Sequence, residues 1–278
     1  MWQLQKYLII LLGLVAASVG RAQEKPQSDF ALRFEGNRIF PATELSAPVE
    51  KCLARPSRSS TPRPIEKLEY CLSKLESILH SKGYLQARVG KPQQQESEAG
   101  LTWLVPLTEG RLYRLGEVHI EGSKLLLPNQ MLEMLDLKTD EIADASRIEV
   151  WLYERVAKVY RNSGYWQFTA EVEPSYHVKA NAEAGIADLN VTIDEGPVFT
   201  IRSINFDGRG DISNESLLRQ MLVTVGEVFK QDLFEDSLKR ISEDGQFETI
   251  DADRDVELKT ERDNPTVDLT IHLKKKIS

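Results

Sequence analysis

The chain has 278 residues, of which 41% are apolar and 28% are charged, a balance typical of a globular protein with room for two or three domains. Its formal net charge of -8 argues against sequence-independent nucleic-acid binding, which needs a cationic surface. The same charge disfavours adhesion to anionic lipid.

The first 22 residues are typical of an export signal. Lys6 supplies the positive start, residues 7–19 form an apolar stretch, and Gly20 and Ala22 place small residues before a cleavage position. The apolar stretch is shorter than the ~20 residues of a membrane-spanning helix. We therefore expect residues 1–22 to be a signal peptide that is cleaved after Ala22. The alternative is an uncleaved inner-membrane anchor.

Cysteine occurs only at Cys52 and Cys71, which flank a loop rich in Arg, Ser and Pro. In an exported chain two cysteines can pair, and a disulfide here would tie two helices together across the loop. The alternative is that both are small buried apolar residues, since Cys71 falls on the apolar stripe of its helix.

An internal repeat organises the rest of the chain. The segment 109–122 can be laid over 195–208 without a gap, and both begin with Glu-Gly and end with an alternating strand before Gly. The same strand precedes Gly36, and a second marker recurs at Gly83-Tyr84, Gly164-Tyr165 and Gly245-Gln246. Three units follow, which we place at residues 28–112, 113–198 and 199–278.

Each unit has the same predicted elements in the same order. An alternating strand ends at a Gly, and a short helix follows that begins at Pro41, Pro128 or Ser213. A second helix with an apolar stripe at helical spacing leads to a strand of mixed polarity, a polar hairpin, and a cleanly alternating closing strand. Recurrent glycines that end a strand or helix, or that link two units, are predicted at Gly36, Gly83, Gly110, Gly122, Gly164, Gly196, Gly208 and Gly245.

This order predicts an α+β fold of three tandem β-α-α-β-β modules. In each, two amphipathic helices cover one face of a three-stranded mixed sheet. Because Glu109-Gly110 and Glu195-Gly196 join neighbouring units almost directly, we expect a semi-rigid curved rod.

The strand ending in Gly, the Gly-Tyr after the second helix, and Glu195-Gly-Pro followed by Phe199-x-Ile-x-x-Ile-x-Phe-x-Gly208 resemble POTRA (polypeptide-transport-associated) domains. These form the periplasmic arms of outer-membrane barrel assembly and translocation proteins. The resemblance covers residues 28–275, and it is weaker in the first unit, where Arg111 replaces the Pro of Glu-Gly-Pro.

The resemblance implies that the closing strand lies between the other two, so that the middle strand of each unit has an open edge. A segment of another polypeptide could add there as a further strand. The expected middle strands are 84–89, 165–172 and 247–258, and the alternative is that these edges are only protected from aggregation. Candidate binding residues are Tyr84, Gln86, Arg88, Tyr165, Gln167, Phe168, Glu171, Phe247, Thr249 and Asp255.

Other signals favour no catalysis. Asp251, Asp253, Asp255 and Glu257 alternate, but the calcium-loop pattern fails because Val256 and Arg262 stand where Gly and Glu are required. We expect these acids to share one solvated face of a strand. The four histidines lack metal-ligand spacing, so we expect no enzyme, no metal and no cofactor.

We therefore expect a periplasmic scaffold that binds polypeptides and is associated with the outer membrane through a partner. The expected partners are the outer-membrane barrel assembly machinery, unfolded outer-membrane proteins, or both, with no nucleic acid and no small-molecule substrate. The alternatives are an inner-membrane-anchored scaffold, similar to division proteins with a POTRA module, or the N-terminal arm of a longer barrel protein.

Overall fold

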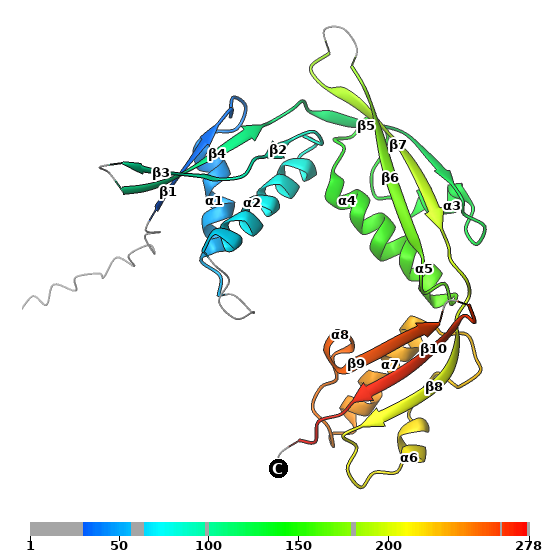
Figure 1. Ribbon diagram of the computed structural model, residues 1–278. Helices are drawn as coiled ribbons and strands as arrows, with labels where there is room; N and C mark the ends of the chain where they lie inside the picture. Colours follow the sequence, from blue (N-terminus) through cyan, green and yellow to red (C-terminus); the bar gives the residue numbers. More distant parts are fainter. Residues whose placement is uncertain (1–29, 57–63, 98–99, 179–181, 262, 277–278) are drawn as a thin grey trace, which may run out of the picture.

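The computed structural model describes residues 30–56, 64–97, 100–178, 182–261 and 263–276, so the expected signal peptide lies outside the described residues. Three separate sheets follow one another along an arc (Figure 1). We call each sheet with its helices a unit. The predicted fold class is confirmed: each unit is α+β, with helices on one face of a mixed sheet.

The elements of each unit follow the predicted order, with additions. The first unit contains β1 (Phe30–Glu35), α1 (Ala42–Leu53), α2 (Pro64–Ser81), β2 (Arg88–Val89), β3 (Gln93–Ser97) and β4 (Gly100–Thr108). The second contains β5 (Tyr113–Glu121), α3 (Pro128–Glu133), α4 (Ala145–Glu149), the π-helix η1 (Val150–Val156), α5 (Ala157–Asn162), β6 (Thr169–His177) and β7 (Gly185–Asp194). The third contains β8 (Thr200–Asp207), α6 (Asn214–Leu218), α7 (Gln231–Glu243), α8 (Ala252–Asp255), β9 (Val256–Glu261) and β10 (Thr266–His272).

The closing strand is central in every sheet. β4, β7 and β10 pair in parallel with the first strand of their unit, and antiparallel with its middle strand. A strand bonded on both sides and covered by helices on one face buries every second side chain, which is why the closing strands alternate so cleanly. In β10 the side chains of Val267, Leu269 and Ile271 are fully buried.

Each unit has its own hydrophobic core. The first is built around Leu68, Leu72 and Leu75 of α2, the second around Trp151 and Leu152 of η1, and the third around Leu238 and Ile241 of α7, each packed on the closing strand. Because each sheet packs on the helices of its own unit, the chain has three cores rather than one merged core.

The middle strands differ from the expectation. β2, β6 and β9 begin at Arg88, Thr169 and Val256, several residues after the expected starts. In the first two units a hydrogen-bonded turn follows the glycine, with Ala87 N donating to Tyr84 O at 2.8 Å and Phe168 N donating to Tyr165 O at 3.2 Å. The polar segment before the closing strand of the first unit also contains a strand that was not predicted, because Gln93–Ser97 forms β3 and pairs antiparallel with β4.

All of the predicted glycines have positive φ. At Gly36, Gly122 and Gly208 the chain also passes so close to the closing strand that an added Cβ would lie 2.1, 2.2 and 2.2 Å from the carbonyl oxygen of Leu107, Ile193 and Leu273. Only a residue without a side chain fits this approach, so the strand-ending glycine recurs in every unit.

Cys52 and Cys71 form a disulfide, the first of the two alternatives considered, and it joins α1 to α2 with their Cα atoms 5.7 Å apart. We expect reduction to destabilise the first unit by about 3 kcal/mol, because the cross-link closes a loop of 19 residues in the unfolded chain. Hydrogen exchange in α1 and α2 with and without dithiothreitol measures this, and exchange in the other units should not change. Equal exchange in α1 under both conditions would contradict the expectation.

Neighbouring units are joined by one repeated backbone contact. The first amide of the next unit donates to the carbonyl of the glycine after the second helix: Tyr113 N to Gly83 O, and Phe199 N to Gly164 O, both at 2.9 Å. Side chains reinforce each junction, with Tyr113 Oη donating to Gln86 Oε1 at 2.6 Å and Asp232 N donating to Asn162 Oδ1 at 2.9 Å. The arc in Figure 1 thus has two similarly built joints.

Within the part of the chain that the structure describes, no helix has the length and apolar character needed to cross a membrane. The described residues also contain no group of three or more His, Cys, Asp or Glu side chains arranged to hold a metal ion.

Candidate polypeptide-binding edge

One border of each sheet is formed by the middle strand, as the central position of the closing strand requires. These borders are β2 with β3, β6, and β9, and none of them has a partner strand on its outer side among the described residues. An unpaired border offers amide and carbonyl groups to another extended chain. The three borders differ in how their own unit already uses these groups.

In the second unit, β6 is a long border of 9 residues. Tyr153 Oη donates to Ala170 O at 2.9 Å, so the backbone of Ala170 faces away from β7. Because an antiparallel ladder alternates, the backbone also faces outward at Val172, Pro174 and Tyr176. Proline has no backbone N–H, so Pro174 leaves no ladder hydrogen bond unmade at an outward-facing position, as is typical of an edge strand. Val172 and Tyr176 are left to present outward amides.

An apolar groove runs beside this border, between β6 and the helix formed by α4 and η1. Its volume is about 300 Å³. Val172, Pro174 and Tyr176 form the strand side, and Glu149 contributes its one carboxylate. The remaining lining residues come from the helix, from β7 and from the first unit: Ala145, Ile148, Leu152, Tyr153, Leu189, His80 and Leu85.

The helical side of the groove is fixed by its own polar contacts. The Asp144 carboxylate accepts from the Ser146 and Arg147 amides and caps α4. The buried Trp151 indole donates to Met131 O at 2.7 Å and ties η1 to α3. The π-helical turn of η1 carries Tyr153, whose hydroxyl reaches across to β6. Such π-turns are rare and frequently lie at functional sites.

In the first unit, helix side chains already occupy the border. The Glu76 carboxylate of α2 accepts from the Val89 amide at 2.7 Å, and His80 Nε2 lies 2.9 Å from Ala87 O. Arg88 donates from Nη1 to Ala87 O as well. The groups that a further strand would need are therefore engaged where β2 begins.

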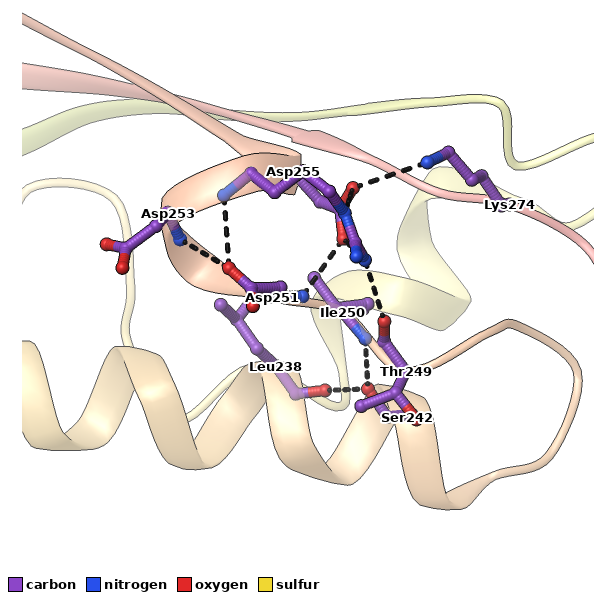
Figure 2. A network of polar contacts seen from close by, with 9 residues as sticks. Leu238, Ser242, Thr249, Ile250, Asp251, Asp253, Asp255 and Lys274 are labelled. Carbon is purple, nitrogen blue, oxygen red and sulfur yellow. Dashed lines mark hydrogen bonds and ion pairs between the residues drawn. The ribbon is translucent and has the colours of Figure 1, made fainter. Parts of the chain in front are cut away.

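In the third unit, a polar network folds the segment before β9 back toward α7 (Figure 2). The Asp255 carboxylate accepts from the Asp251 amide at 3.0 Å and from the Arg254 guanidinium, and lies 3.6 Å from Lys274 Nζ. Ser242 Oγ donates to Leu238 O and accepts from the Ile250 amide. The Arg254 hydrogen bond outweighs the opposing effect of burial and holds the pKa of Asp255 well below its usual range.

The expectation that the acids 251–257 alternate along a strand face is therefore wrong. Asp251 instead caps α8 by accepting from the Asp253 and Arg254 amides, and Asp255 is buried. The groove of the third unit, between α7 and this segment, has a volume of about 390 Å³. It is lined by the charged side chains Glu235, Lys239 and Glu243 as well as by apolar ones.

Few of the predicted binding residues lie on a middle strand. Glu171 lies within β6 and Arg88 begins β2. The others precede their strands: Phe168 and Phe247 are buried in cores, Gln86 is bonded across the first junction, and Asp255 belongs to the network of Figure 2. Tyr84, Tyr165, Gln167 and Thr249 lie in the turns or connections before β2, β6 and β9.

The sequence pattern places Glu109 and Glu195 in the links between units and predicts no further role for them, yet both are buried. The Glu109 carboxylate accepts from the amides of Arg38, Ile39 and Phe40 at 2.7–2.8 Å, and it is 5% exposed. The Glu195 carboxylate accepts from the Lys124 and Leu125 amides. Each anchors the loop after the first strand of its unit, and their equivalent positions in the repeat are the signal that could have revealed this.

The third unit replaces this glutamate. Gly36, Gly122 and Gly208 approach Leu107, Ile193 and Leu273, so the residue two positions further is Glu109, Glu195 and Lys275. Lys275 Nζ lies 3.9 Å from an Asp211 carboxylate oxygen. The third unit thus has a cation at the position of the buried glutamate, and its carboxylate partner is fully exposed.

Comparison with known proteins agrees with the fold. The family model "POTRA: Surface antigen variable number repeat" matches residues 113–196 and 199–276. The outer membrane protein assembly factor BamA of Neorickettsia risticii is 25% identical over 236 residues, covering 82% of this chain and 31% of the relative. A putative outer membrane protein assembly factor of Treponema pallidum is 25% identical over 216 residues, covering 76% of this chain and 25% of the relative.

The chain thus spans a third or less of the length of these curated relatives. Among solved structures, POTRA domains 3–5 of Haemophilus influenzae BamA superpose with a TM-score of 0.70 at 19% identity, covering 89% of this chain and 96% of that one. That likeness shows the fold, and the family model matches more than half of the sequence. The chain belongs to the POTRA family.

Proposed function

We propose that the chain is a periplasmic polypeptide-binding scaffold that acts in outer-membrane protein assembly and is associated with the outer membrane through a partner. The names of its relatives as assembly factors support this role. Its partners are the barrel assembly machinery, unfolded outer-membrane proteins, or both. In this proposal residues 1–22 are removed as a signal peptide, and 28–112, 113–198 and 199–278 act as three non-catalytic modules.

We propose further that an extended segment binds by adding to the outer side of β6. The observation that carries this is the apolar groove beside a border whose Val172 and Tyr176 amides face outward. Main-chain hydrogen bonds would give affinity with little dependence on sequence, and the groove would select apolar side chains at alternate positions. The first border is less suited where β2 begins, because Glu76 already accepts from the Val89 amide. In the third unit the network of Figure 2 holds the segment before β9, and the adjacent groove is lined in part by charged side chains, which suit an apolar segment less well.

Amide hydrogen exchange tests this proposal. A peptide of the length of β6, 9 residues with alternating apolar and polar side chains, is added to the chain. At a peptide concentration about 100 times its Kd, exchange at Val172 and Tyr176 should slow by about 100-fold. The Val89 amide, already bonded to Glu76, is the internal control and should not change.

A second peptide distinguishes strand addition from simple filling of the groove. N-methylation of every second amide, on the side that meets β6, should abolish binding, whereas methylation of the other set should not. Binding that is insensitive to both, or protection that appears away from β6, would contradict the proposed mode.

A further inference from the structure

The groove beside β6 is not made by the second unit alone. Leu85 and His80 belong to the first unit, in the turn after α2 and near the end of that helix, yet both line the groove. Leu85 also packs against the core of the second unit. His80 is held in place by its contact with Ala87 O at 2.9 Å. One end of the groove is therefore supplied from across the junction.

The junction and the groove also share an aromatic contact. Tyr113 begins the second unit and bonds to the first one twice, through its amide to Gly83 O and through its hydroxyl to Gln86 Oε1. The Tyr113 ring packs on Tyr176, with ring centroids 4.6 Å apart. Tyr176 lines the groove, so a continuous set of contacts leads from the first unit to the groove wall.

The second junction lacks this arrangement. Trp166 occupies the corresponding turn, and its ring packs on Phe229 with centroids 5.1 Å apart, against the core of the third unit. The groove of the third unit, however, is lined only by residues 235–252, all from that unit. Of these two grooves in the described structure, the one beside β6 alone draws on two units.

We infer that the groove beside β6 is a two-unit site, in which a bound segment contacts Leu85 and His80 of the first unit and thereby stabilises the first junction. This inference rests on the proposed strand addition at β6. A ligand that binds only the assembled arrangement must favour it, and by the same linkage loosening the junction must weaken binding. Occupancy by a polypeptide and the angle between the first two units are then coupled.

The first test compares two variants of the full chain with the same 9-residue alternating peptide. Leu85→Ala removes the apolar side chain that the first unit supplies to the groove. Binding should weaken by about tenfold, because the bound peptide loses apolar contact equivalent to roughly two buried methylene groups. Trp166→Ala loosens the other junction without touching the groove and should change the Kd by less than about twofold. Circular dichroism checks that both variants fold.

The second test measures the junction itself. Spin labels on cysteines introduced at the exposed positions Glu69 and Glu154 report the distance between the first two units, and labels at Glu154 and Asp236 report the distance between the second and third. The peptide should narrow the first distance distribution and leave the second unchanged.

The outcomes separate the two proposals. If the peptide binds Leu85→Ala as tightly as the natural chain, or leaves the first distance distribution unchanged, the two-unit site is wrong while strand addition at β6 stands. If the natural chain does not bind the peptide at all, both proposals are overturned.

Discussion

Replacing Gly208 by alanine should destabilise the third unit by about 4 kcal/mol, near the upper end of what single substitutions cost. The residue has φ of +74°, where an L-residue is strained, and a Cβ would lie 2.2 Å from Leu273 O. Because that oxygen belongs to the backbone, no side chain can rotate away to relieve the contact. Either β8 or the end of β10 must move.

A matched control lies in the same unit. Gly245 has φ of +82°, but a Cβ there would meet no heavy atom within 4 Å among the described residues beyond its chain neighbours. Gly245→Ala therefore carries only the backbone strain, about 1 kcal/mol. Urea unfolding followed by hydrogen exchange in β10 compares the two variants. Equal losses would show that φ alone, and not the close approach, makes these glycines necessary.

Replacing Glu195 by alanine should destabilise the second unit by about 3 kcal/mol, because it leaves several buried or half-buried donors without their acceptor. One carboxylate oxygen of Glu195 accepts from the Lys124 and Leu125 amides at 2.7 Å and from Tyr160 Oη at 2.9 Å. Glu195→Gln keeps an acceptor and loses the charge, so it should cost less, about 1 kcal/mol. Urea unfolding with hydrogen exchange in β7 measures both.

The Glu195 interaction also predicts a pH dependence. Burial opposes ionisation, but the bonds from the Leu125 and Lys124 amides and the Tyr160 hydroxyl outweigh it, so the pKa of Glu195 lies below its ordinary value of 4.5. A carboxyl whose pKa is lower in the folded state contributes its full stabilisation above the unfolded-chain pKa and loses it as pH falls through the folded-state pKa.

The second unit should therefore lose stability as the pH falls below about 4.5, and Glu195→Gln should remove part of that slope. Glu173→Gln, which changes an exposed carboxylate of the same sheet, is the control and should leave the slope in place. A slope that is the same in all three proteins would show that Glu195 does not contribute to it.

The fold followed from the sequence because its strongest signals are local and recur three times. Closing strands such as β7 and β10 alternate cleanly since they are central in their sheets, and the strand-ending glycines mark a close approach that no other residue tolerates. The sequence pattern did not predict where the middle strands begin. Alternating polar and apolar residues after Gly83 and Gly164 fit a strand as well as the hydrogen-bonded turn that is present.

The candidate site was predicted only in outline. The open border of the middle strand came from the family resemblance, but the feature that distinguishes β6 is a groove made by residues distant in sequence, from His80 to Leu189. Nothing in the local pattern indicates that η1 is π-helical and brings Tyr153 to β6. Alternating acids at 251–255 suggested a strand because cap and ion-pair partners such as Lys274 become visible only in three dimensions.

The shared design of the two joints gives the chain leverage. A unit whose central strand has 10 residues is about 33 Å long, so a swivel of about 10° at either joint displaces the far tip of the next unit by about 6 Å. Substitutions around Gly83 or Gly164 can thus change the reach of the whole arm while every sheet stays intact. The distance between the first and third units is therefore set by the few backbone atoms that form the hydrogen bonds at Gly83 and Gly164.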